Sequence, residues 1–444
     1  MNKMESMPIR KLVLTMSIPI AGSMLISALY NIVDGIFVAQ YSGDGFLAVS
    51  LAAPVQALMI AVACGLGVGF NTILARFLGQ KNEKQAAKAT AIGLMLAAAA
   101  GLIFAILGLV SSRSFLRLFS NDSVVLEMGT PYLQICTLFS FTIFFQIAFE
   151  RIMQAVGRPM YNLWIQGVGA VVNIILDPLF IFTFKMGVTG AAIATVTGQG
   201  VAMILGSVLT LKKVKEIHLK RQDFNPNWHL VGMIMKIAAP AIVMQAVTSF
   251  MSVFMNALLG LNSATAISAF GVYSKLQQFV LMTVLGITNA IIPIIAFNYG
   301  AGHGKRIAQT VRFSLELAIG IMAFGTVLFQ LFPQALLTLF DADEALMSVG
   351  ISCLRILSIG FVFMGISLIC CASFQALNHS GVSLTITLFR QLFGLIPLSA
   401  LLMGLFGLDG AWAAFPIIEV IGAAASWVEW KKIRKQRVDP EMNG

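Results

Sequence analysis

Long apolar segments constrain this chain more than any other feature of its sequence. There are twelve of them, separated by short stretches rich in glycine, proline or charge. A helix needs about 20 mostly apolar residues to cross the hydrocarbon core of a bilayer. The pattern therefore predicts twelve membrane-spanning helices, at residues 12–39, 47–78, 88–110, 131–156, 160–184, 188–211, 233–260, 265–299, 307–331, 347–377, 381–404 and 408–430.

Composition supports an all-α integral membrane protein. Of 444 residues, 58% are hydrophobic and 11% are charged, and a soluble protein of this size could not bury that much apolar surface. The first apolar segment is too long for the core of a signal peptide, and it carries Asn31 and Asp34. We therefore expect it to be a retained spanning helix.

The positions of Lys and Arg predict the orientation in the membrane. With both ends cytoplasmic, most of the 29 Lys and Arg residues fall on the cytoplasmic side, and only Arg113, Arg117 and Lys185 fall outside. Cytoplasmic loops of membrane proteins carry such an excess. The net charge of +10 is thereby explained without a nucleic-acid partner.

An internal repeat divides the chain. Pro19 in "SIPIAG" corresponds to Pro240 in "AAPAIV", an offset of 221 residues, and further identities keep this register: Gln56 with Gln277, Gly65 with Gly286, Gly79 with Gly300, Lys84 with Lys305, Gly129 with Gly350 and Gln154 with Gln375. After a slip of one residue, "GVTGAA" (187–192) pairs with "GLDGAW" (407–412). Shared hydrophobicity alone would not maintain a register, so we infer two homologous six-helix halves.

The repeat predicts the domain organisation. We expect an N-terminal lobe at 1–211, a cytoplasmic linker at 212–232, a C-terminal lobe at 233–430 and a basic cytoplasmic tail at 431–444. Because six is even, both lobes enter the membrane in the same sense, and their pseudo-two-fold axis lies along the membrane normal. Such lobes form a V with a central cleft.

Polar residues interrupt the apolar segment 160–184 at "NIILDP". Asn173 and Asp177 are four residues apart and therefore share one helix face, and Pro178 leaves a backbone carbonyl without its helical donor. Asp34 on the first helix and Thr195 on the sixth are expected nearby. These oxygen ligands suit a hard cation such as Na⁺, or protons shared between the two carboxylates. The four histidines fall outside the spans, so a soft-metal site is not expected.

The second half lacks this polar set. At the repeat offset, Asp34 corresponds to Met255, Asn173 to Gly394 and Asp177 to Leu398. The polar residues are therefore not needed to build a six-helix lobe. The alternative is that Asn173 and Asp177 only join helices, but a buried acid is a costly way to do so.

Other charged residues in the spans have alternative interpretations. Glu150 suits either an interfacial ion pair with Arg151 or a cavity role. We expect Glu316 to pair with Arg312 one turn earlier. Mutual neutralisation is favoured for four residues in the second half: Lys275, Arg355, Arg390 and Glu419.

No enzymatic motif appears. "GLGVGF" (65–70) has no P-loop Lys-Ser/Thr, and no extramembrane segment is long enough for an ATPase domain. A pump built from this chain would therefore use an ion gradient, which predicts a secondary active transporter with no cofactor. An integral-membrane enzyme is the less favoured alternative, because no nucleophile or acid/base constellation lies near a membrane surface.

Several motifs resemble the multidrug and toxic compound extrusion (MATE) transporters, of the bacterial type. They are "YNIVDGIFVAQYSG" (30–43), "LAAPVQ" (51–56), "QAVGRPMY" (154–161), "NIILDPLFIF" (173–182) and "IPIIAFNYGAG" (292–302). The resemblance implies a monomeric antiporter of the bacterial inner membrane that exports organic, mainly cationic, compounds in exchange for Na⁺ or H⁺. A lipid-linked-sugar flippase of the same superfamily is the alternative.

The resemblance also assigns residues. Family members with an ion site in the N-terminal lobe use residues that match Asp34, Asn173, Asp177 and Thr195. Glu150 matches an acid implicated in some bacterial members, and Pro19 matches a proline at which the first helix bends. Another branch carries acids at positions near Thr248 and Met364, where this chain has none. A cation site in the C-terminal lobe is therefore not expected.

Overall fold

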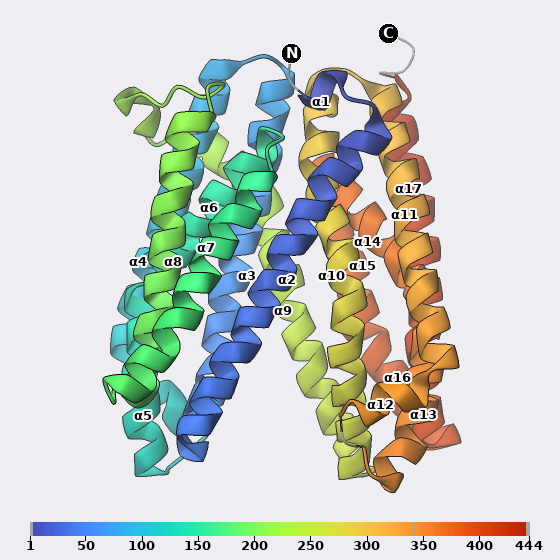
Figure 1. Cartoon of the computed structure of the whole chain (residues 1–444). Helices are drawn as coiled ribbons and strands as arrows, with labels where there is room; N and C mark the ends of the chain where they lie inside the picture. The colour runs from blue at the N-terminus through green and yellow to red at the C-terminus, as the bar shows by residue number, and fades with distance from the viewer. Residues whose placement is uncertain (1–2, 341, 441–444) are drawn as a thin grey trace. The chain divides into compact units, whose positions relative to one another are not determined.

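The computed structural model describes residues 3–340 and 342–440, which form helices joined by short connections (Figure 1). The helices of the first half are α1 (Lys3–Ser6), α2 (Ile9–Tyr41), α3 (Gly43–Gly79), α4 (Glu83–Arg117), α5 (Ser123–Leu138), α6 (Phe141–Ala155), α7 (Met160–Pro178), η1 (Leu179–Thr183), α8 (Gly187–Lys213) and η2 (Arg221–Phe224). Those of the second half are α9 (Trp228–Gly260), α10 (Ala264–Gly300), α11 (Gly304–Leu331), α12 (Pro333–Thr338), α13 (Glu344–Ser358), α14 (Phe361–Ala376), α15 (Ser380–Leu388), η3 (Phe389–Phe393), α16 (Leu395–Phe406), α17 (Leu408–Ile433) and η4 (Arg434–Val438).

The described helices account for the predicted spans. Nine are long and apolar enough to cross a membrane, or eleven if each of two bent helix pairs is one span. The bends are 43° between α5 and α6, and 46° between α13 and α14. The segment Ser380–Val438 is counted once, yet it turns at Gly407, whose φ of 69° favours glycine, so that α16 packs against α17. Taken as two limbs, this segment completes the twelve.

Helix boundaries repeat with the offset that the sequence predicts. The bounds of α3 and α10 are both displaced by 221 residues, and so are the first residues of α4 and α11. The N-caps repeat as well: Ser42 accepts a hydrogen bond from the Gly45 amide at 3.2 Å, and Ser263 from the Ala266 amide at 3.1 Å. A capping hydroxyl satisfies one backbone N–H at the helix start. The structure thus confirms the two homologous halves.

Contacts between residues divide the chain into two compact units at positions that also obey the repeat. One unit is Gly22–Ile242, called here the N-terminal unit; the other combines Met1–Ala21 with Val243–Gly444 and is called the C-terminal unit. The chain changes unit inside α2 and inside α9, two residues after Pro19 and two residues after Pro240. The lobe boundaries expected from the sequence stay a prediction, and residues 441–444 of the tail lie outside the described residues.

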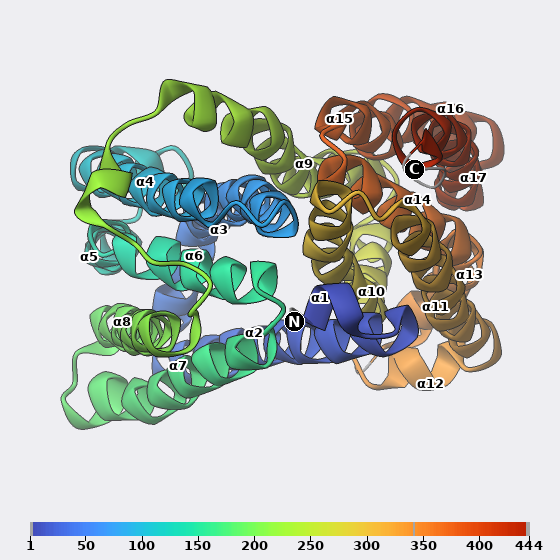
Figure 2. The same cartoon turned by 90° about the horizontal axis from the view of Figure 1, so that it is seen from above.

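Close packing in the N-terminal unit joins α7 to α8, which run side by side (Figures 1 and 2). Gly169 and Gly198 lie at their crossing, where a Cβ on Gly198 would be 2.7 Å from the Gly169 carbonyl oxygen. Small residues at a crossing let two membrane helices approach with their backbones in contact. Side chains just beyond the crossing on α7 and α8 are therefore brought within hydrogen-bonding range.

The C-terminal unit has an aromatic core. The ring of Phe270 stacks on that of Trp412 with centroids 6.2 Å apart, and Phe329 meets Phe361 edge to face at 5.1 Å. Offset and edge-to-face pairs of this kind add to the stabilisation from burial. In the same unit α1 lies at the same end as the last turns of α17 (Figure 1).

Candidate functional site

Asn173 and Asp177 form the centre of the polar site. Both lie on α7, and their side chains are 2% and 0% exposed. The Asn173 amide donates a hydrogen bond from Nδ2 to Asp177 Oδ1 at 3.3 Å. The expectation that the two share one helix face is thus met in the structure.

Thr195 joins them from α8. Asn173 Nδ2 lies 3.5 Å from Thr195 Oγ1, at the outer limit of a hydrogen bond. The contact depends on the glycine crossing, because a Cβ on Gly198 would be 3.1 Å from the Cβ of Asn173. The close packing of α7 and α8 therefore builds this side of the site.

Asp34 reaches the same place from α2. Its carboxyl group and that of Asp177 lie close enough to share a hydrogen bond. Two carboxyl groups can do so only when one of them carries a proton. Three buried oxygen atoms have no hydrogen-bond donor among the described residues: Asp34 Oδ1, Asn173 Oδ1 and Asp177 Oδ2. Buried acceptors without a donor are costly unless a cation or a proton satisfies them.

A small cavity adjoins Asn173 and Thr195. Its volume is about 10 Å³, room for a single water molecule or a bare cation. The sequence analysis missed four of its polar lining residues: Tyr30, Gln146, Gln166 and Gln199. Glutamine in an apolar segment is the signal that could have identified three of them, because neutral amides are also costly in a bilayer unless they have a partner.

Glu150 is connected to this cavity through Gln146. Gln146 Nε2 donates to Glu150 Oε1 at 3.2 Å and to Gln166 Oε1 at 2.9 Å. Glu150 itself does not line the cavity. The structure therefore places Glu150 one side chain away from the group formed by Asp34, Asn173, Asp177 and Thr195.

The two prolines singled out from the sequence occupy different places. Pro178 is the last residue of α7, and the π-helix η1 begins directly after it. Single π-helical turns in a helix are frequent at functional sites. Pro19 lies inside α2 near the point where the chain changes unit, away from the polar group in sequence and in contact-based unit.

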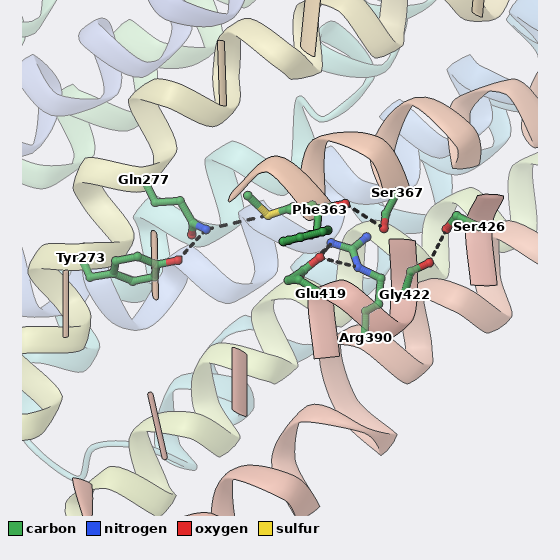
Figure 3. Close-up of polar contacts among 9 residues, drawn as sticks. Tyr273, Gln277, Phe363, Ser367, Arg390, Glu419, Gly422 and Ser426 are labelled. Atoms are coloured by element: carbon green, nitrogen blue, oxygen red, sulfur yellow. Dashed lines mark hydrogen bonds and ion pairs between the residues drawn. The ribbon is translucent and has the colours of Figure 1, made fainter. Parts of the chain in front are cut away.

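In the C-terminal unit, Arg390 and Glu419 form a bidentate ion pair (Figure 3). Arg390 Nε lies 2.9 Å from Glu419 Oε2, and Arg390 Nη2 lies 2.8 Å from Oε1. Their side chains are 4% and 16% exposed. The predicted neutralisation is confirmed for this pair. Lys275 instead lies over the Phe340 ring, 6.0 Å from its centroid.

This ion pair occupies positions that correspond to the polar cavity of the other half. At the repeat offset Arg390 corresponds to Gly169 and, after the one-residue slip, Glu419 corresponds to Gln199. The stem of Arg390 packs on Gly422, where an added Cβ would lie 2.5 Å from Arg390 Cδ. One half thus has glycine and a cavity where the other has a charged pair.

Neutral groups occupy the positions where another branch of transporters has acids. Thr248 Oγ1 donates to Gln391 Oε1 at 3.2 Å. Gln277 Nε2 donates to Tyr273 Oη at 2.8 Å and lies 3.8 Å from Met364 Sδ (Figure 3). These neighbours are uncharged. They offer no carboxylate pair comparable to Asp34 and Asp177.

Known proteins resemble this chain in fold over almost its whole length. A MATE crystal structure in a bent conformation aligns with a TM-score of 0.93 at 24% identity, over 98% of this chain and 97% of that one. An outward-facing multidrug resistance MATE family transporter aligns with a TM-score of 0.91 at 24% identity, with the same coverage. These likenesses show the fold.

Curated proteins are similar in sequence. Multidrug export protein MepA of Staphylococcus aureus (strain MRSA252) is 26% identical over 426 residues, 95% of this chain and 93% of that protein. A protein described as an FAD transporter, from Shewanella oneidensis, is 27% identical over 435 residues, 95% of this chain and 94% of its own length.

The MatE family model matches the chain twice. The matched stretches are residues 19–179 and 240–401, one in each half, and their first residues are the corresponding prolines Pro19 and Pro240. Together they cover most of the chain. The match therefore agrees with both the internal repeat and the fold, and the chain belongs to the MatE family of membrane transporters.

Proposed function

We propose that this protein is a cation-coupled antiporter that exports organic compounds by alternating access. One observation carries the proposal: three helices bring Asp34, Asn173, Asp177 and Thr195 together at one buried place, with acceptor oxygens that lack donors. The corresponding positions of the second half have no such set. A feature that only one of two homologous halves retains serves something other than the scaffold.

The charge of the site favours a cation. Two carboxylates in contact, away from bulk water, repel each other unless a proton or a metal cation neutralises part of their charge. Carboxylate, amide and hydroxyl oxygens are ligands for a hard cation. Na⁺ and H⁺ are both compatible with this donor set, and either is cargo of the transport cycle rather than a resident cofactor.

Coupling follows if the driving cation and the exported compound favour different states. A ligand shifts a conformational equilibrium only by its difference in affinity for the two states. Cation binding removes charge from Asp34, and α2 carries that change along one continuous helix past Pro19 into the other contact-based unit. We propose that α2 links occupation of the site to the change of access.

The exported compounds are proposed to be organic cations. An acidic site that accepts Na⁺ or H⁺ is also attractive to a protonated amine, and competition for the same carboxylates would couple the two fluxes. The relative described as a multidrug export protein supports a broad substrate range. The relative described as an FAD transporter favours a second candidate, an anionic flavin nucleotide.

The proposed setting is a bacterial inner membrane, with the protein acting as a monomer and both ends in the cytoplasm. Orientation rests on the distribution of Lys and Arg. A lipid-linked-sugar flippase is the alternative within the same superfamily. A requirement for a lipid head group, in place of resistance to cationic drugs on expression, would favour the flippase.

The decisive experiment is transport by purified protein in proteoliposomes. Efflux of a cationic dye is followed at constant pH with and without an opposing Na⁺ gradient, and then with a pH gradient alone. Stimulation by one gradient identifies the coupling ion. Equal efflux without either gradient contradicts antiport. A flavin nucleotide added in place of the dye separates the two substrate classes.

A further inference from the structure

A long groove lies on the surface of the C-terminal unit, between α11 and α17 with α14 as its floor. Its volume is about 650 Å³, within the usual range of ligand pockets of roughly 300–1,000 Å³. The walls are apolar side chains, and several remain exposed, including Ile319 and Val420. The polar site described above belongs to the other unit and shares none of these residues.

The length of the groove matches one leaflet of a bilayer. On α17 the lining extends from Val420 to Trp430, and on α11 from Ala308 to Ile319. At a rise of 1.5 Å per residue each wall is about 15 Å long. That is about half of the 30 Å hydrocarbon core. An acyl chain of one leaflet therefore fits along it.

One end of the groove carries cations and tryptophans. Arg312, Arg434, Trp427 and Trp430 all line it, and the Lys431 ammonium lies over the Trp427 ring at 5.7 Å. Tryptophan and basic residues concentrate at the level of lipid head groups. By the distribution of Lys and Arg, this end is the cytoplasmic one.

Both arginines retain donors for a phosphate. Arg312 contacts Glu316 through Nε at 3.0 Å, and Arg434 contacts Asp439 through Nε at 3.1 Å. In the part of the chain that the structure describes, no contact engages the terminal nitrogens of either guanidinium group. Those nitrogens are the ones that bind phosphate in a fork geometry.

The corresponding place in the first half differs. Arg312 corresponds to Ala91 and Glu316 to Met95, and Trp427 and Trp430 correspond to Ser207 and Thr210 after the slip. There the chain supplies its own cover, since η2 of the linker packs against α4, the counterpart of α11. The basic and aromatic rim is therefore particular to the second half, where the groove stays open.

We propose that this groove binds one anionic glycerophospholipid of the cytoplasmic leaflet. An acyl chain lies along the apolar walls of α11, α14 and α17. The phosphate contacts the terminal nitrogens of Arg312 and Arg434, beside Trp427. Basic pockets between spanning helices on the cytoplasmic side are suited to such head groups. The proposal is independent of the cation site.

Lipid retention by the purified protein tests it. Native mass spectrometry compares the whole protein with phosphatidylglycerol and with phosphatidylcholine of the same acyl chains. We expect preferential retention of phosphatidylglycerol. R312Q/R434Q lowers that retention on the order of tenfold, because each basic residue near the surface contributes about a fivefold factor. Lys432→Gln removes a charge from the same region outside the groove and leaves retention unchanged.

The acyl wall is tested separately. Ala424→Trp fills the groove at an exposed lining position and is expected to reduce retention of both lipids, whereas Gly320→Trp, on α11 in open space, does not. Equal retention of the two lipids by the native protein would overturn the proposal. So would full retention by R312Q/R434Q, or displacement by glycerophosphoglycerol, which lacks acyl chains. Thermal unfolding of every variant confirms that it is folded.

Discussion

The amide of Asn173 donates to the carboxylate of Asp177 one turn further along α7, at 3.3 Å, and Asp34 from α2 faces the same carboxyl group. Asn173 thus holds one oxygen of Asp177, while the other has no donor. A carboxylate held in this way is oriented toward Asp34 rather than free to turn. This relationship makes the function of each side chain separately testable.

Asp177→Asn tests the pair directly. The change keeps the volume of the side chain but removes one of the two negative charges. We expect gradient-driven efflux to fall at least tenfold, because the remaining carboxylate no longer needs the driving cation for neutralisation. Efflux per folded molecule is measured in proteoliposomes, with Glu316→Gln in the exposed pair on α11 as the control. Unchanged gradient-driven efflux would refute the ion site.

Thr195→Val distinguishes the two coupling ions. Valine matches threonine in shape but removes the hydroxyl oxygen that lies 3.5 Å from Asn173 Nδ2. If Na⁺ drives transport, loss of one ligand raises the Na⁺ concentration for half-maximal efflux by about tenfold. If H⁺ drives transport, the change has little effect. Thr197→Val is the control, since Thr197 is exposed on the same helix and bonds only its own turn.

Glu150→Gln is expected to have a milder effect than Asp177→Asn. Glu150 reaches the cavity only through Gln146, which donates to it at 3.2 Å, and glutamine can accept the same hydrogen bond. We predict a loss of several-fold in efflux rate with the ion dependence retained. A complete loss would place Glu150 in the cation site itself.

Gly198→Ala tests the packing that builds the site. The new Cβ would lie 2.7 Å from the Gly169 carbonyl oxygen, so α7 and α8 must separate. We expect a loss of about 1–3 kcal/mol in stability together with weaker cation dependence. Gly200→Ala is the matched control, because its Cβ would meet only a methyl group at 3.9 Å. Thermal unfolding and transport are measured on both, and equal behaviour would contradict the role of the crossing.

Glu419→Gln separates stability from transport. It leaves the Arg390 guanidinium buried without its counter-charge, which costs about 3–5 kcal/mol. Replacing both partners, as R390M/E419L, should restore most of that stability. Unfolding temperature and yield are measured first, and then efflux per folded molecule, which we expect to be nearly unchanged. A selective loss of efflux in a stable double variant would instead assign the pair to transport.

Much of the architecture was predictable from the sequence, because a bilayer imposes one period on every span. Apolar segments predicted the helices, and the offset of 221 residues predicted the corresponding ends of α3 and α10. The separation of four residues between Asn173 and Asp177 is enough to place them on one helix face. These features depend only on residues near one another in the chain or on its internal repeat.

The sequence could not reveal which distant helices meet. Gln146, Gln166 and Gln199 are scattered along three helices, and only the packing of α6, α7 and α8 brings them around one cavity. The same holds for Arg390 and Glu419, whose pairing was one of several possible among four charged residues. Contacts of this kind depend on helix rotation and on glycines such as Gly198, which the sequence does not specify by itself.

The sequence by itself determined the number of spans, the repeat and the acidic character of the first half. Tertiary structure decided that Asp34 faces Asp177, that a cavity adjoins Asn173, and that a groove between α11 and α17 stays open. The physical reason is that hydrophobicity sets where a helix begins and ends, whereas side-chain packing sets which of its faces meets a neighbour.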